Sequence, residues 1–246
     1  SSCGLALGLA AFGKQVVVHN ENGFIPRYKV IPGAESVVQG GWGTLQATDL
    51  LIVCDCGAKE RVGDSLLEAL VSAPCVINID HHNANSQFGH VNYVVEGASS
   101  TSELVYDILA GLEQREGRKD IITANTAACL MAGIIGDTGS FRYASTSAKT
   151  FLVAHNLVLR GARPDVLTQE LFATQSLPAM KLQAEAMSNL VLHNNGVFAE
   201  VVVTQSMLQK HGADLLDADS LAERARDIEG VRVSALYKED KDIWRV

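Results

Sequence analysis

Short apolar runs alternate with helical patterns over the first part of the chain. Continuous apolar segments at residues 16–19, 49–54 and 75–79 have the length of strands and are bounded by polar or turn-forming residues. The spacing of apolar positions predicts helices at residues 1–12, 65–72, about 101–112, 120–136 and 146–160. Runs that are apolar throughout are typical of parallel strands buried on both faces. The pattern predicts an α/β fold with a doubly wound, mainly parallel sheet.

The pattern changes after Pro164. Residues 164–193 are mostly helical in pattern, with Pro178 in a first-turn position. Strands at 197–203 and 231–237, and helices at 205–211 and 220–227, then predict a smaller, incomplete α+β domain. The last residues, 242–246, have the pattern of a strand that stops midway. We therefore expect a first domain over residues 1–165, a helical linker over 166–189 and a partial second domain over 190–246.

Two segments have the spacing of a capping box, in which a serine begins a helix and a glutamate follows three residues later. These are Ser100 with Glu103, and Ser220 with Glu223. Each pair predicts the first turn of a helix.

Composition and charge narrow the function classes. The chain has 246 residues, of which 47% are hydrophobic, and a net charge of -8, so we expect no binding to long duplex nucleic acid. The five cysteines show no framework spacing, which indicates buried thiols in a reducing compartment, and we expect the cytoplasm. No apolar run is long enough to predict a membrane span, and residues 1–12 are expected to form a buried helix rather than a signal peptide.

Acidic and imidazole side chains stand at the ends of several predicted elements. Asp55 follows the strand at 49–54, Asp80-His81-His82 ends the strand at 75–79, and Asp137 ends the helix at 120–136. Carboxyl ends of parallel strands gather ligand-binding groups. Asp55 or Asp137 alone is more often a turn or cap residue, but two adjacent histidines have no common structural role. Carboxylates with imidazoles suit a divalent ion such as manganese, which would also attract a phosphoryl group.

Other motifs leave alternatives open. Cys54 and Cys56 flank Asp55 and admit a zinc site with His81, although no second cysteine pair has matching spacing. Arg142 is either a phosphate clamp or a surface arginine. Gly40-Gly41-Trp42-Gly43 is not expected to be a phosphate loop, because no Lys-Ser/Thr pair follows it.

Four segments, in order, resemble motifs of the DHH phosphoesterases, closest to the branch of short-oligoribonucleotide hydrolases and pAp phosphatases. The resemblance covers most of the chain. The segments are IVCDCGAKERVG (52–63), VINIDHHN (76–83), GASSTSELVYDIL (97–109) and GIIGDTGSFRYASTSAKTF (133–151). It implies an enzyme with two manganese ions, held by Asp55, His81 and Asp137, that activate water. It also implies that His82 contacts the scissile phosphate and that Asp80 orients the histidines.

The family's first motif, a histidine and two aspartates, is expected before residue 1, and its glycine-rich substrate motif after residue 246. The expected substrate is a short oligonucleotide or the nucleoside bisphosphate pAp, and a homodimer is one expected assembly. Two other functions stay open: a manganese-dependent inorganic pyrophosphatase and a non-catalytic nucleotide-binding domain.

Overall fold

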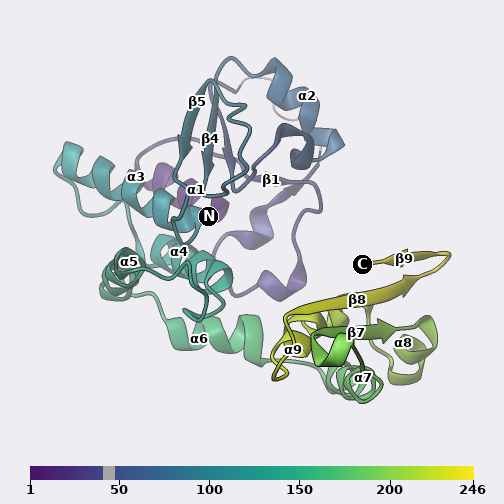
Figure 1. Cartoon of the computed structure of the whole chain (residues 1–246). Helices are drawn as coiled ribbons and strands as arrows, with labels where there is room; N and C mark the ends of the chain where they lie inside the picture. The colour runs from purple at the N-terminus through teal and green to yellow at the C-terminus, as the bar shows by residue number, and fades with distance from the viewer. Residues whose placement is uncertain (41–47) are drawn as a thin grey trace. The chain divides into compact units, whose positions relative to one another are not determined.

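The computed structural model describes residues 1–40 and 48–246 and divides into two compact units, Ser1–Ala173 and Thr174–Val246 (Figure 1). The predicted helical segment at 166–189 spans this division. Helix α6 (Pro164–Thr168) and the turn η5 (Gln169–Ala173) belong to the first unit, and α7 (Leu177–Ser188) belongs to the second. The expectation for Gly41-Trp42-Gly43 lies outside the described residues.

A three-stranded parallel sheet forms the centre of the first unit. Its strands are β3 (Leu51–Cys54), β4 (Val76–Asp80) and β5 (Val91–Val94), in the order β3-β4-β5. Cys54 lies opposite Ile79 in the β3–β4 ladder, so the two strands end at the same edge. The prediction of the second and third apolar runs as parallel strands is confirmed. β5 was not predicted, because its sequence, Val-Asn-Tyr-Val, is neither continuously apolar nor preceded by a helix.

The predicted strand at residues 16–19 is wrong. Of these residues only His19 lies in a strand, the two-residue β1 (His19–Asn20), which pairs with β2 (Val38–Gln39) outside the main sheet. Val16 and Val17 are 38% and 61% exposed, so this apolar run is not buried on either face. A run of valines has high strand propensity, but its burial depends on neighbouring strands and helices that the local sequence does not reveal.

Helices cover both faces of the three-stranded sheet, which confirms the doubly wound architecture. On one face, Leu51 and Val53 pack with the cluster that contains Leu70 of α2 (Asp64–Ser72). On the other face, Ile52 and Ile79 join the main core formed with α1 (Ser2–Ala11), α3 (Thr101–Glu116) and α4 (Ala124–Asp137). Successive residues of a strand point to opposite faces, so a continuously apolar strand serves both layers.

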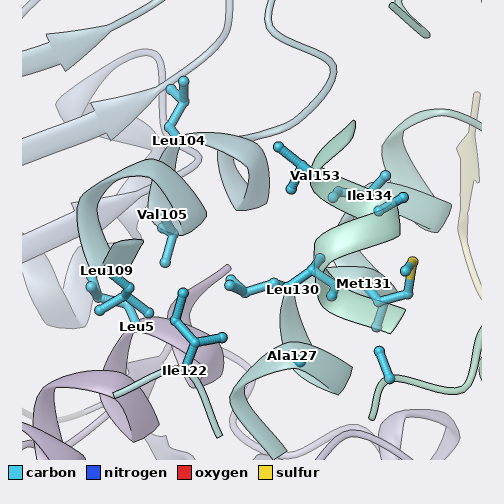
Figure 2. Close-up of a cluster of buried hydrophobic side chains, with 14 of the residues drawn as sticks. Leu5, Leu104, Val105, Leu109, Ile122, Ala127, Leu130, Met131, Ile134 and Val153 are labelled. Atoms are coloured by element: carbon cyan, nitrogen blue, oxygen red, sulfur yellow. The ribbon is translucent and has the colours of Figure 1, made fainter. Parts of the chain in front are cut away.

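Figure 2 shows the main core, in which apolar side chains of α1, α3, α4 and α5 (Ala148–Leu159) meet. Gly4 and Gly8 lie one turn apart on α1, where a Cβ would touch Leu130 and Leu109, so their small size lets α1 approach α3 and α4. Completely buried members of the core include Leu104, Val105, Leu109, Leu130, Met131 and Ile134. This packing fixes the start of α3 and the end of α4.

The second unit has a mixed four-stranded sheet, as expected for an α+β domain. Its strands, in the order β6-β7-β8-β9, are Val191–His193, Phe198–Val203, Val233–Asp240 and Ile243–Arg245. The ladder between β7 and β8 is parallel and the outer two are antiparallel. Helices α7, α8 (Gln205–His211) and α9 (Leu221–Arg226) provide Leu182, Leu208 and Leu221 to its core.

The helix starts depend on side-chain caps. Ser100 accepts a hydrogen bond from the amide of Glu103, and α4 begins later than predicted because Thr123 caps it. The capping box at Ser220 and Glu223 is wrong, since the Ser220 side chain makes no cap hydrogen bond. Short 3₁₀ turns complete the described elements at Pro26–Tyr28, Ala34–Ser36, Lys59–Val62, Asn194–Gly196 and Leu215–Ala218. None of the helices within the described residues has the length and apolar character needed to cross a membrane.

Candidate metal centre

The ends of three elements bring the predicted site residues together. Asp55 directly follows β3, Asp80 ends β4 with His81 and His82 next in sequence, and Asp137 is the last residue of α4. The Asp55 amide donates to the Ile79 carbonyl at 2.9 Å, which extends the β3–β4 pairing by one residue. Asp55 itself has a φ of 64°, so its backbone turns out of the strand direction immediately after that bond.

His81 lies between the two carboxylates. Its Nε2 is 3.5 Å from Asp55 Oδ1 and 3.9 Å from Asp137 Oδ2. On the opposite side of the ring, Nδ1 lies 3.0 Å from the carbonyl oxygen of Ala98. Because that carbonyl can only accept, Nδ1–H donates to it, and Nε2 is left facing the carboxylates.

The proximity of these groups changes their protonation. The hydrogen bond with His81 lowers the pKa of Asp55 to about 2, and the same bond raises the pKa of His81 to about 9. Burial raises the pKa of Asp137 to about 6, and the neighbouring Asp55 carboxylate adds to the increase. The protonation of each of the three groups therefore depends on its neighbours, which is common where charge is gathered for a function.

His82 is held by a completely buried carboxylate. Its Nδ1 lies 2.7 Å from Asp80 Oδ1, and Asp80 is 0% exposed. Asn85 donates to Asp80 Oδ2 at 2.6 Å. Burial opposes ionisation of Asp80, but the hydrogen bonds from Asn85 and His82 outweigh it and lower its pKa. With Nδ1 engaged, the Nε2 atom of His82 is the one left for a ligand.

The sequence analysis missed several supporting polar groups. Thr101 Oγ1 donates to Asp55 Oδ1 at 2.9 Å, from the first residue of α3. The completely buried Asn78 accepts from Asn85 Nδ2 at 2.8 Å and donates to the carbonyl of Cys56 at 3.1 Å. One signal was present, since an asparagine inside the apolar strand VINID requires a buried hydrogen-bond partner.

The donor set fits a hard or borderline divalent ion. Within the described residues, one ligand atom from each of Asp55, His81 and His82 lies within 4.8 Å of the others, and His81 also lies near Asp137. Carboxylate oxygens and imidazole nitrogens are suitable ligands for such an ion. Neither Cys54 nor Cys56 belongs to this group of the described residues, and Cys56 Sγ instead donates to the Ala58 carbonyl at 3.1 Å.

Arg142 is engaged within its own loop. Its Nε donates to the Gly139 carbonyl at 2.8 Å, and its guanidinium carbon lies 6.0 Å from the centre of the Tyr143 ring. The side chain is exposed to solvent. These contacts leave the rest of the guanidinium accessible but do not join it to His81 or the carboxylates.

A doubly wound α/β unit with carboxylates and adjacent histidines at the ends of its strands defines a class of domain that can hold a divalent ion at the edge of its sheet. The chain matches the DHH family, N-terminal domain, over residues 1–134. It therefore belongs to the DHH family, as the four sequence motifs predicted.

Relatives and a solved structure agree with this assignment. The chain is 32% identical over 199 residues to the bifunctional oligoribonuclease and PAP phosphatase NrnA of Bacillus subtilis, with 80% of this chain and 60% of that protein covered. The protein of the same name from Thermus thermophilus is 29% identical over 98% of this chain and 68% of its own length. An exopolyphosphatase-related protein from Bacteroides fragilis superposes with a TM-score of 0.89 at 25% identity, over 99% of this chain and 72% of that one. The chain thus spans about 60% of the length of the Bacillus relative.

Proposed function

We propose that this protein is a metal-dependent phosphoesterase that hydrolyses short oligoribonucleotides, pAp, or both. The observation that carries the proposal is the position of His81 Nε2 between Asp55 and Asp137 at the ends of β3 and α4. The names of the Bacillus and Thermus relatives, which pair oligoribonuclease with PAP phosphatase, support the choice of substrates.

Asp55, His81 and Asp137 hold the metal in this proposal, and Mn²⁺ is the ion we expect. Two ions are expected in the complete protein. A divalent ion bound there would lower the pKa of a water molecule and offset the charge of a phosphoryl group. The Ala98 carbonyl supports this role, because it orients His81 so that Nε2 faces the carboxylates. The hydrogen bond from Thr101 similarly restricts the carboxylate of Asp55.

His82 contacts the scissile phosphate in this proposal, and Asp80 positions it. Nδ1–H donates to Asp80 Oδ1, which leaves Nε2 as the ring atom available to a phosphate oxygen. Asn85 supports the role by holding the other oxygen of Asp80. His82 also lies close enough to Asp55 and His81 to be a metal ligand, and metal content separates the two roles. Arg142, which is exposed, is proposed as an additional phosphate contact.

The test is hydrolysis of an RNA dinucleotide, pAp and pyrophosphate, side by side, by the full-length gene product. Each substrate is assayed with Mn²⁺, with Mg²⁺, and after treatment with a chelator. We expect cleavage of the dinucleotide or pAp that chelator abolishes and Mn²⁺ restores, with pyrophosphate left intact. Preferential cleavage of pyrophosphate would replace the proposal with a pyrophosphatase. Binding of nucleotide without turnover of any substrate would indicate a non-catalytic domain.

A pair of variants separates this centre from a zinc site. The double substitution Cys54→Ser with Cys56→Ser should leave metal stoichiometry unchanged, whereas Asp137→Ala should reduce it. The reverse result would favour a structural zinc site. A cytoplasmic location and a homodimer stay predictions, to be checked by fractionation of cells and by light scattering of the purified protein.

A further inference from the structure

A buried glutamate on α3 is bonded to the segment that contacts the candidate metal centre. Glu103, the third residue of α3, is 2% exposed. Its Oε2 accepts hydrogen bonds from Ser99 Oγ at 2.6 Å and from Thr150 Oγ1 at 3.1 Å, and its Oε1 lies 3.4 Å from Lys149 Nζ. A buried carboxylate is costly unless it is paired in this way.

The contacts of Glu103 differ from those that its sequence position predicts. In a capping box the glutamate would reach back to the amide of the cap residue. Here Ser100 Oγ accepts from the Glu103 amide at 3.2 Å, but the carboxylate of Glu103 bonds to Ser99 and Thr150 instead. The side chain therefore ties the segment before the helix to the first turn of α5.

That segment, residues 98–101, makes two of the contacts that orient the metal centre. The Ala98 carbonyl accepts from His81 Nδ1 at 3.0 Å, and Thr101 Oγ1 donates to Asp55 Oδ1 at 2.9 Å. Ser99 lies between these two residues and is 0% exposed. The bond from Ser99 to Glu103 fixes the middle of a segment whose two ends hold the two proposed ligands.

We propose that Glu103 is a positioning residue of the metal centre, acting through Ser99 on the Ala98 carbonyl and the Thr101 hydroxyl. This inference rests on the proposed function of the site as a metal centre. Groups that orient metal ligands typically change metal affinity about 10–100-fold when they are removed. A role in fold stability alone would not set metal affinity or the hydrogen bond from His81 to the Ala98 carbonyl.

The same helix provides a matched control. Glu113 is also buried on α3, at 6% exposure, and also accepts several hydrogen bonds, from Arg160 and from the amides of Ile121 and Ile122. It lies at the opposite end of α3 from Thr101 and makes none of the contacts to the metal centre described above. A comparison of the two glutamates separates loss of a buried carboxylate from loss of site geometry.

The experiment compares Glu103→Met, Glu103→Gln, Ser99→Ala and Glu113→Met in the full-length protein. Mn²⁺ dissociation constants come from electron paramagnetic resonance, folding from urea denaturation, and kcat and KM from hydrolysis of pAp. Glu103→Met should weaken Mn²⁺ binding about 10-fold or more. Glu103→Gln should remain close to wild type, because one amide oxygen can still accept from both hydroxyls. Glu113→Met should lose stability but keep its Mn²⁺ affinity within about twofold, since its contacts are remote from the ligands.

Ser99→Ala keeps the experiment decisive where a Glu103 variant does not fold, and it should reproduce most of the loss in Mn²⁺ affinity. A metal-free measurement accompanies it: the ¹H and ¹⁵N resonances of His81 Nδ1–H, which should shift and broaden in Glu103→Met and Ser99→Ala because the bond to the Ala98 carbonyl is loosened. Unchanged Mn²⁺ affinity in these two variants, or equal losses in Glu113→Met, would overturn the inference. Failure of the wild type to bind Mn²⁺ would instead count against the proposed function, and the His81 spectra would still decide the role of Glu103.

Discussion

Helices α3 and α4 are in close contact where Ser102 faces Gly133, and this contact supports a quantitative prediction. A Cβ atom at Gly133 would overlap Ser102 Oγ and lie 3.0 Å from Ser102 Cβ. Ser102 is 1% exposed, so its side chain cannot swing into solvent. Three residues further along α4, a Cβ at Gly136 would meet nothing within 4 Å. The two glycines therefore differ in surroundings while sharing one helix.

The expected effects follow from two opposing terms. Alanine in place of glycine stabilises a helix by about 1 kcal/mol at an interior position and by less near its end. Overpacking of a buried contact costs about 1–3 kcal/mol. Gly136→Ala should therefore stabilise the fold slightly, and Gly133→Ala should destabilise it by up to about 2 kcal/mol. The difference between the two variants, in which the helix term largely cancels, should be about 1–3 kcal/mol.

Urea denaturation, followed by circular dichroism, measures these free energies of unfolding. Ser102→Ala removes the atom that overlaps and also a buried hydroxyl that has no hydrogen-bond partner within the described structure. In the Gly133→Ala background it should recover part of the loss, with a coupling free energy of about 0.5–3 kcal/mol. Equal stabilities of Gly133→Ala and Gly136→Ala, within about 0.5 kcal/mol, would refute the close packing on which this reasoning depends.

Four further predictions concern the site and a buried ion pair. Asp55→Ala should abolish turnover and weaken Mn²⁺ binding, and retained activity in a hydrolysis assay would contradict its assignment as a ligand. His82→Ala should lower kcat but keep the metal content measured by mass spectrometry, because its proposed partner is phosphate. In metal-free protein, Asp55→Gly should be about 1 kcal/mol more stable than Asp55→Ala by urea denaturation, since the φ of 64° strains alanine; equal stability would argue against that backbone. Burial raises the pKa of Glu113, but the hydrogen bond from Arg160 outweighs it, so the pKa lies below its ordinary 4.5. Glu113→Gln should therefore cost about 1.5–3 kcal/mol at neutral pH, and its difference from wild type should shrink as titration proceeds below pH 4.5.

The elements that were predicted correctly can be recognised from a short stretch of their own sequence. The strands around Ile52 and Ile77 are mostly apolar because each packs helices on both faces, and such runs are visible in the sequence. Strand β5 lacked that signal, since its Asn92 and Tyr93 make it resemble a loop. Val16 and Val17, in contrast, led to the prediction of a buried strand that the structure does not have. The reason is that β-branched residues favour extended structure whether or not a sheet is available.

The residues of the candidate site were likewise predictable only in part. Asp55, His81 and Asp137 could be selected because each stands at the end of a predicted element, where side chains converge. Their partners Ala98 and Thr101 could not, because the contacts depend on where the start of α3 packs, 17 residues beyond His81 and 46 beyond Asp55. A backbone carbonyl such as that of Ala98 also leaves no trace in the identity of its residue.

The candidate metal centre adjoins a layer of buried polar groups, and this links its geometry to the stability of the fold. Asn78, Asp80, Ser99 and Glu103 are at most 2% exposed, and each is hydrogen-bonded within the protein. A buried polar group left without a partner costs about 1–3 kcal/mol, so the layer is stable only when its bonds are formed together. The orientation of His81 and His82 is consequently not free to vary with the exposed loops around them. The same hydrogen bonds that make burial of this layer tolerable also set the directions in which the two imidazoles point.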